Sequence, residues 1–124
     1  MKIYKRLISF VLVLICASLI IIIALFFSNA DFQEFVLSNL YQEETIYAKG
    51  YSPKHWKRIK LGDSREKVLK ILGEPLKKLL NRKDEARAFF YSSQGPKNTN
   101  YRVRSIIFNE SGMVIEKNNY FYLD

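Results

Sequence analysis

The residues that most often perform catalysis are few in this sequence and stand apart from one another. Cys16 is the only cysteine and lies in an apolar segment, and His55 is the only histidine and lies in a stretch typical of a linker. A Ser-His-Asp or Cys-His arrangement, and equally a zinc site, would have to use that histidine without a partner motif. The five glycines are isolated, which argues against a glycine-rich phosphate loop. We therefore expect no enzymatic activity, no catalytic or metal-binding residues, no cofactor and no small-molecule substrate.

Two carboxylates that could form an acid–base pair, Asp63 and Glu66, are better explained as helix-capping residues. They lie in LGDSREKVLKILGEP, residues 61–75, where Ser64 is typical of the residue that precedes a helix. Apolar residues then recur on one helical face, and a glycine suited to a left-handed backbone closes the helix before a proline. The residues of this structural motif are Gly62, Ser64, Val68, Leu72, Gly73 and Pro75.

Positive charge is concentrated in the middle of the chain. Residues 54–87 contain twelve Lys and Arg and five Asp and Glu, a net charge of +7 in a chain of net charge +8. The four basic residues at its start are candidates for contact with an anionic surface: Lys54, Lys57, Arg58 and Lys60. Export, predicted below, removes nucleic acid from reach, so anionic lipid head groups or an acidic protein face become the expected partners. The alternative is that these charges only solvate a small basic domain.

The C-terminal aromatic run admits two interpretations. Tyr120, Phe121 and Tyr122 could fill the core beside the last strand. Alternatively, Tyr120 and Tyr122 could form an exposed patch that binds a partner by strand addition or by burial of aromatic side chains.

A three-stranded antiparallel sheet is predicted for the second half of the chain. Three segments rich in aromatic and β-branched residues are expected to form its strands: 86–93, 101–108 and 113–123. NESG, residues 109–112, predicts a tight turn with Gly112 at positive φ. The preceding segment, residues 76–85, could begin as a strand edge or a helical turn and then loop out.

The expected core lies between this sheet and the helical elements. Val103 and Ile106 are three residues apart, so a bulge near Ser105 is expected if both face the core. The predicted core residues, besides some of the C-terminal aromatics, are Trp56, Ile59, Leu61, Val68, Leu69, Leu72, Phe90, Ile107 and Val114.

The N-terminus carries a segment long enough to cross a membrane. Residues 7–27 are almost wholly apolar, and as a helix they would span about 30 Å. Basic residues precede the segment and acidic residues follow it, so the positive-inside rule places residues 1–6 in the cytoplasm and the chain after Ala30 across the membrane, in the periplasm. Two alternatives remain, cleavage of an export signal after Ala30 and lipid attachment at Cys16.

Residues 28–55 are expected to connect this anchor to the domain. Phe32, Phe35, Val36 and Leu40 recur at helical spacing. The helix could continue the membrane span, lie on the membrane surface, or pack on the domain. Residues 48–55, with Gly50 and Pro53, read as a linker. The domain proper is then residues 56–124.

The motif of residues 62–75, the FFYSS strand and the IIFNESGMVIEK hairpin resemble a known family. They are similar to the small outer-membrane lipoproteins of the SmpA/OmlA family, which includes the BamE subunit of the β-barrel assembly machine. The resemblance implies an α+β fold like that of the β-lactamase inhibitor protein, with one or two short helices on a three-stranded antiparallel meander. Here that domain would follow an N-terminal transmembrane helix, whereas the relatives in the machine are lipid-anchored.

Together these features predict a non-enzymatic interaction module, tethered to the inner membrane as a single-pass protein and facing the periplasm. It would bind the membrane and an envelope protein. The alternatives are a lipid-facing structural protein that binds anionic head groups and, by analogy of fold, an inhibitor of a secreted enzyme.

Overall fold

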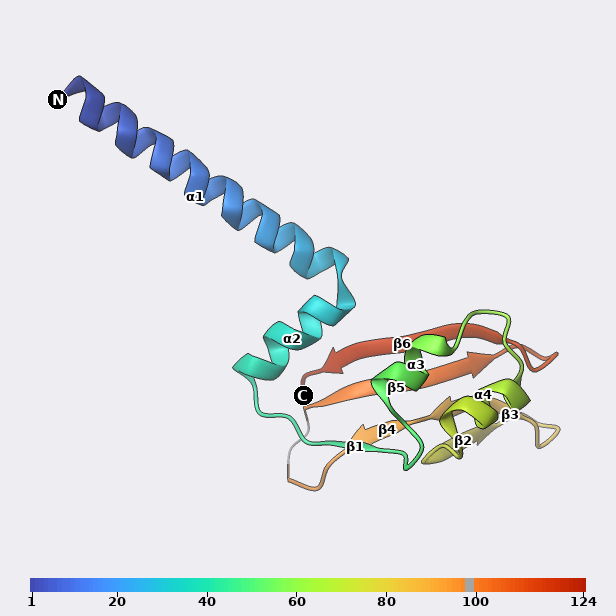
Figure 1. The fold of residues 1–124 in the computed structure, drawn as a ribbon. Coiled ribbons are helices and arrows are strands. Elements are labelled where there is room, and N and C mark those ends of the chain that lie inside the picture. The colour runs from blue at the N-terminus through green and yellow to red at the C-terminus, as the bar shows by residue number, and fades with distance from the viewer. Residues whose placement is uncertain (98–99) are drawn as a thin grey trace.

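The computed structural model describes residues 1–97 and 100–124. It begins with α1, Lys2–Ser28, a helix long and apolar enough to cross a membrane, with no buried residue. A single residue, Asn29, separates α1 from α2, Ala30–Leu40. Figure 1 shows α1 running away from the rest of the chain, with α2 turned toward the sheet. The predicted apolar helix is thus confirmed, and its topology in a membrane stays a prediction.

Two short helices follow, α3 (Pro53–Arg58) and α4 (Arg65–Leu72). Pro53 was expected in a linker, but it begins α3, because proline fits the first helical turn and the Ser52 hydroxyl caps the helix by accepting the His55 N–H. The start of α4 is as predicted, with the Ser64 hydroxyl accepting the Lys67 N–H. Gly73 ends it at φ 70° and ψ −164°, a region of backbone space open essentially to glycine alone.

The sheet contains the predicted meander and one strand more. In the described residues, the order is β2-β3-β5-β6, with each neighbouring pair antiparallel. The strands are β1 (Thr45–Tyr47), β2 (Lys77–Leu80), β3 (Ala86–Phe90), β4 (Ser92–Gln94), β5 (Tyr101–Phe108) and β6 (Val114–Tyr122). The expected three strands therefore become four, because residues 77–80 form an edge strand. The predicted strand 86–93 breaks at Tyr91, and its second part pairs with β1 in a separate two-stranded sheet.

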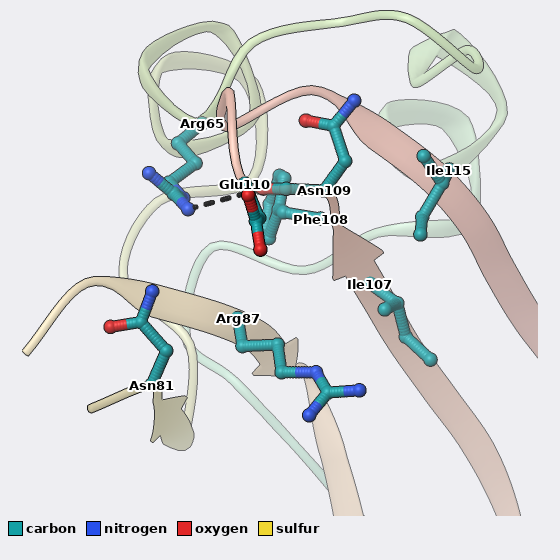
Figure 2. Close-up of a pocket in the computed structure, with 8 residues that line it drawn as sticks. All are labelled: Arg65, Asn81, Arg87, Ile107, Phe108, Asn109, Glu110 and Ile115. Carbon is teal, nitrogen blue, oxygen red and sulfur yellow. Dashed lines mark hydrogen bonds between the residues drawn. The ribbon is translucent and has the colours of Figure 1, made fainter. Parts of the chain in front are cut away.

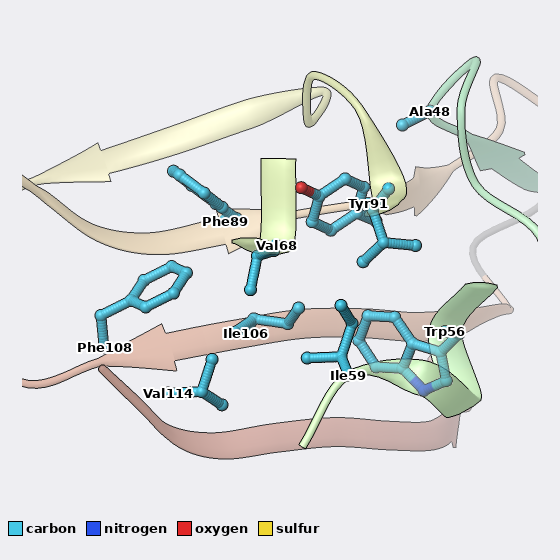
Figure 3. Packing of buried hydrophobic residues seen from close by; sticks show 10 residues of the cluster. Ala48, Trp56, Ile59, Val68, Phe89, Tyr91, Ile106, Phe108 and Val114 are labelled. Atoms are coloured by element: carbon cyan, nitrogen blue, oxygen red, sulfur yellow. The ribbon is translucent and has the colours of Figure 1, made fainter. Parts of the chain in front are cut away.

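The core lies between the helices and one face of the sheet, named here the helix face (Figure 3). Its most buried members are Trp56, Ile59, Val68, Leu72, Phe89, Tyr91, Ile106, Phe108 and Val114, and Ala48 joins them from the segment before α3. Leu69 is partly buried against this cluster. The predicted core is wrong at Leu61, which is 67% exposed in the loop between α3 and α4.

Phe90 and Ile107 were also expected in the core, and both lie on the opposite face. Each is next to the residue that takes the core position: Phe89 pairs with Ile106 on the helix face, while Ala88 pairs with Ile107 on the other. Alternate residues of a strand point to opposite faces, so a one-residue error in parity exchanges the two sets.

The bulge predicted near Ser105 is absent from β5, where the pairing with β6 runs without interruption from Tyr101 to Ile107. Val103 and Ile106 are both buried, but they face opposite sides of the sheet, so no extra residue is needed between them. The irregularity falls at Ile107/Phe108, beside the hairpin, where Gly112 has the predicted positive φ of 79°.

The first residues of the structural motif, Gly62 to Arg65, hold α4 against this hairpin. The Gly62 N–H donates to the Val114 carbonyl, the Val114 N–H donates to the Asp63 carbonyl, and the Arg65 N–H donates to the Gly112 carbonyl. At the other end, the Tyr91 hydroxyl donates to the Gly73 carbonyl at 2.9 Å. These contacts explain why so short a helix carries such strong start and stop signals: both ends are bonded to the sheet.

Candidate binding surface

The face of the sheet turned away from the helices has a buried floor, formed in part by Val103 and Ser105, and an exposed rim that includes Leu79 and Tyr120. Within residues 1–97 and 100–124 it forms a groove of ≈ 490 Å³ across all four strands. We name it the open face; its lining residues are Leu79, Arg87, Ala88, Phe90, Ser92, Tyr101, Val103, Ser105, Ile107, Asn118 and Tyr120. Leu79 is 47% exposed and Tyr120 is 46% exposed. Large apolar side chains that are exposed together on one surface often mark a binding site.

Amide and hydroxyl groups lie among these apolar side chains. The Asn118 amide donates to the Ser105 hydroxyl at 3.1 Å across β5 and β6. The rings of Tyr101 and Tyr122 lie 5.5 Å apart. Burial, with a smaller effect of neighbouring Tyr120 and Tyr122, raises the pKa of Tyr101, which keeps its phenol neutral and able to donate. Aromatic rings with hydroxyl tips are typical of protein-binding surfaces.

Arg87 is the charged residue of this groove, and it also connects the groove to a second hollow. That hollow has a volume of ≈ 420 Å³ and shares Arg87 and Ile107 with the first. Its other side is formed by Arg65, whose guanidinium lies 5.6 Å from the centre of the Phe108 ring. Figure 2 shows both arginines beside the hollow, with Glu110 between them. The hollow next to the apolar groove is therefore lined by two cations and one carboxylate, and it shares Arg87 with the groove.

The predicted anion-binding residues are elsewhere in the fold. Lys54, Lys57 and Arg58 lie on α3, Lys60 follows it, and all four are exposed. None of these side chains forms an ion pair within the described residues. Lys57 lines a hollow together with Asp31, at the start of α2. Lys57 thus lies near the start of α2, whereas Arg58 lines a different hollow together with Lys67 and Lys70 of α4.

The predicted partner-binding aromatics both lie outside the core. Tyr120 lines the open face, and Tyr122 is 41% exposed beside Tyr101. The structure brings them together with Leu79, Phe90 and Ile107, which the sequence pattern placed elsewhere. The doublets Phe89-Phe90 and Ile106-Ile107 were the available signal, since such doublets put apolar side chains on both faces of a strand.

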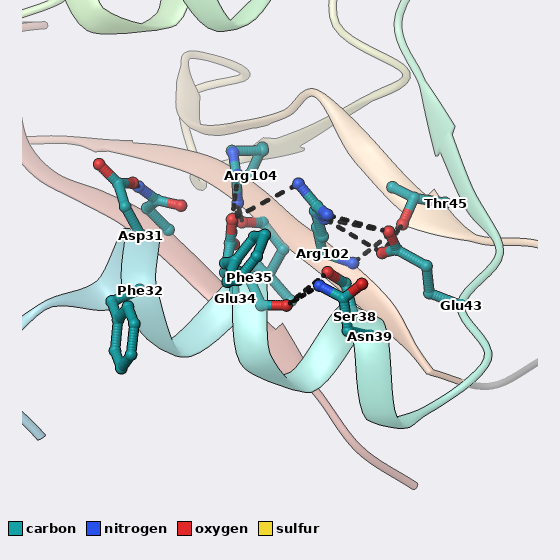
Figure 4. A network of polar contacts seen from close by, with 12 residues as sticks. Asp31, Phe32, Glu34, Phe35, Ser38, Asn39, Glu43, Thr45, Arg102 and Arg104 are labelled. Carbon is teal, nitrogen blue, oxygen red and sulfur yellow. Dashed lines mark hydrogen bonds and ion pairs between the residues drawn. The ribbon is translucent and has the colours of Figure 1, made fainter. Parts of the chain in front are cut away.

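A buried ion pair attaches α2 to the helix face of the sheet. Arg104 Nη1 lies 2.6 Å from Glu34 Oε1, and Nη2 lies 2.7 Å from Oε2 (Figure 4). Glu34 is 4% exposed and Arg104 is 6% exposed. Burial lowers the pKa of Arg104, but the hydrogen bonds and charge of Glu34 outweigh it and raise the pKa. This bidentate pair spans 70 residues of sequence and joins the leader to the domain.

Further contacts complete this polar cluster. Arg104 Nε donates to the Tyr51 hydroxyl at 3.0 Å. Arg102 pairs with Glu43 at 3.1 Å, closer to solvent. Every charged group of the cluster has a charged partner, an arrangement typical of a structural clamp. The segment assigned to leader and linker, residues 28–55, therefore contributes a clamp, a strand and a core residue.

The sparse catalytic residue types stay dispersed. His55 Nδ1 lies 3.5 Å from the Gly50 carbonyl, and Cys16 is exposed on α1. In the part of the chain that the structure describes, no three His, Cys, Asp or Glu side chains gather as metal ligands would.

No protein-family model matches this chain, and no curated protein matches its sequence.

Proposed function

We propose that this protein is a non-enzymatic interaction module of the cell envelope, tethered by α1 to the inner membrane with its domain in the periplasm. Its partner is an envelope protein that binds the open face through an extended segment. The observation that carries the proposal is the open face itself, where Leu79, Phe90, Tyr101 and Tyr120 surround one groove while the helices cover the other face.

The chemistry of the groove favours a polypeptide segment with apolar side chains and one acidic group. Its walls are aliphatic and aromatic, and its hydroxyl and amide groups suit a main chain. Arg87 at the end of the groove is positioned for a carboxylate, because a guanidinium matches carboxylate geometry with two parallel hydrogen bonds. Strand addition at β2 is less suitable, since Lys77 and Lys78 and the register shift at Leu79/Leu80 interrupt that edge.

The test is site-specific photo-crosslinking in the intact envelope. A photoreactive phenylalanine analogue replaces Tyr120 in the full chain, and adducts are identified by mass spectrometry. We expect one protein adduct, joined through an acidic segment, that Arg87→Glu abolishes. The matched control, Lys60→Glu on the helix side, should leave it unchanged. Only lipid adducts or adducts with another copy of this chain, or a protein adduct insensitive to Arg87→Glu, would contradict the proposal.

A second candidate function is contact with anionic head groups through Lys54, Lys57, Arg58 and Lys60. The observation that favours it is that all four are exposed and that Lys57 lines a hollow together with Asp31, at the start of α2. Each well-placed cation contributes about 1 kcal/mol at an anionic membrane, and the effect fades within a Debye length. In the full chain reconstituted in nanodiscs, anionic lipid should slow modification of Lys57 by an amine reagent, and high salt should restore it. Lys83, in the β2–β3 loop, serves as the control; equal rates for Lys57 with anionic and neutral lipid would exclude this function.

A further inference from the structure

The two faces of α2 are arranged opposite to those of an ordinary surface helix. Its polar side faces the protein, where Glu34 is buried against Arg104 and Asp31 accepts a hydrogen bond from Asn119 at 3.4 Å. Its apolar side faces outward: Phe35 is 64% exposed and Leu40 is 71% exposed. A surface helix normally buries its apolar stripe in the core and presents polar groups to water.

The outward side of α2 is mainly apolar, with Phe35 and Leu40 exposed, Phe32 and Val36 half-buried, and Asn39 as an exposed polar residue among them. With 3.6 residues per turn, Phe32 and Val36 project roughly opposite to Glu34, and Phe35 and Leu40 flank them. Figure 4 shows Phe32 on the side of α2 away from the sheet. Two polar side chains on this helix, Ser38 and Asn39, turn back and donate to the Phe35 carbonyl, at 3.1 and 2.6 Å. The Ser38 hydroxyl and the Asn39 amide nitrogen thus have an acceptor within the helix.

The junction with α1 is short and bonded on both sides. Asn29 donates its N–H to the Leu25 carbonyl, the last turn of α1, and its side chain accepts the Phe32 N–H, the first turn of α2. The connection between the two helices is therefore a single residue, Asn29. If α1 crosses a bilayer, α2 begins where the hydrocarbon ends, in the interfacial layer. Figure 1 shows the sheet on the far side of α2 from α1, so the outward side of α2 is turned toward that layer.

We infer that the outward face of α2 (Phe32, Phe35, Val36 and Leu40) lies in the interfacial layer of the membrane that α1 crosses. The inference rests on the membrane tether of the proposed function and commits to lipid as the occupant, because chain continuity brings that surface to the bilayer. Amphipathic helices lie in this plane with their apolar sides among the acyl chains, and Tyr41 at the end of α2 is an aromatic residue of the kind enriched there.

The inference gives the Glu34–Arg104 pair a consequence beyond stability. One side of α2 contacts lipid and the other is bound to β5, so the domain has a fixed orientation against the membrane rather than moving freely on a linker. The open face, on the sheet side opposite the helices, then remains available to a partner.

Quenching of tryptophan fluorescence by brominated lipid tests this directly. The full chain is reconstituted into phosphatidylcholine bilayers with brominated acyl chains, carrying Phe35→Trp or Leu40→Trp. The native Trp56 is 4% exposed in the core and gives a constant background. Leu61→Trp is the matched negative control, because Leu61 is exposed in the loop between α3 and α4, beside the β5–β6 hairpin and away from α2. Leu19→Trp in α1 is the positive control.

We expect the added tryptophan at position 35 or 40 to be quenched, with blue-shifted emission, and the one at position 61 to be unaffected. Quenching at position 19 without quenching at 35 and 40 overturns the inference and leaves the tether intact. Loss of quenching at position 19 overturns both. A blue shift at position 35 without quenching by bromine would assign the surface to a protein contact, such as a second copy, and would also overturn the lipid inference.

Discussion

Removal of the buried Glu34 carboxylate should destabilise the domain more than removal of any exposed charge. Glu34→Ala leaves the Arg104 guanidinium buried without its bidentate partner. Breaking one side of a buried ion pair costs about 3–5 kcal/mol, because the remaining charge is uncompensated in a medium of low polarity.

The structure places the expected cost at the lower end of that range, about 3 kcal/mol. Arg104 keeps the hydrogen bonds to the Tyr51 hydroxyl, at 3.0 Å, and to the Val103 carbonyl, at 2.8 Å. It also lines the hollow that contains Asp31 and Lys57, so water can reach the space left by the carboxylate. For a domain of this size, the urea midpoint should fall by about 2 M.

Urea unfolding of the full chain in detergent micelles, followed by Trp56 fluorescence, measures this cost. Glu43→Ala is the matched control, since Glu43 pairs with Arg102 nearer to solvent and should lose about 1 kcal/mol or less. The double variant Glu34→Ala/Arg104→Ala should recover part of the loss, because the unpaired charge is gone. A midpoint for Glu34→Ala no lower than that for Glu43→Ala would refute this reasoning.

Three further predictions concern the motif around α4 and use the same unfolding assay. Gly73→Val should lower the free energy of unfolding by about 2 kcal/mol, because the backbone at φ 70°, ψ −164° excludes a β-branched residue; a loss near zero would show an ordinary backbone. Tyr91→Phe should cost about 1–2 kcal/mol by leaving the Gly73 carbonyl without its donor, and no loss would mean that water replaces the hydroxyl. The hydrogen bond from the Lys67 side chain, and then that from the Lys60 N–H, lowers the pKa of Asp63 below its usual 3.8. Its stabilising effect is therefore present above that pH and lost as the pH falls through the lower folded value. The difference between the wild type and Asp63→Asn should accordingly be constant near neutral pH and shrink in acid; a difference that is unchanged in acid would contradict this.

Local signals in the sequence predicted the parts of the fold that depend on local physics. The Ser64 cap, the end of α4 at Gly73 and the Gly112 turn each follow from backbone geometry within a few residues, and each is present. Gly73 has the expected positive φ, but its ψ of −164° is extended and differs from the left-handed helical value that the sequence predicts. The three-stranded meander followed from short connections between strand-like segments, which favour antiparallel neighbours.

Features that depend on distant contacts could not be read in this way. Phe89 and Phe90 are chemically identical neighbours, so their sequence does not determine which one faces the helices. Residues 77–80 carry two lysines and two leucines, a pattern with no clear period, and become a strand only because β3 offers a free edge.

The clamp and the open face were missed for the same reason. Glu34 is one acidic residue within an apolar helix, and nothing in its neighbourhood indicates a partner 70 residues away. The candidate surface was found in part, through Tyr120 and Tyr122, because an aromatic C-terminal strand has few structural explanations. Leu79 and Tyr101 join it only when the sheet order is known.

We propose that an envelope protein occupies the open face while this protein is tethered in its native membrane. The most direct measurement is the labelling rate of Tyr120→Cys by a water-soluble maleimide, in a Cys16→Ser background, in native membranes and after purification in detergent. Leu61→Cys reports general accessibility. We predict that position 120 is protected several-fold in native membranes and that Arg87→Glu removes the protection, while position 61 reacts equally in both settings. Equal rates at position 120 in membranes and in detergent would contradict the claim.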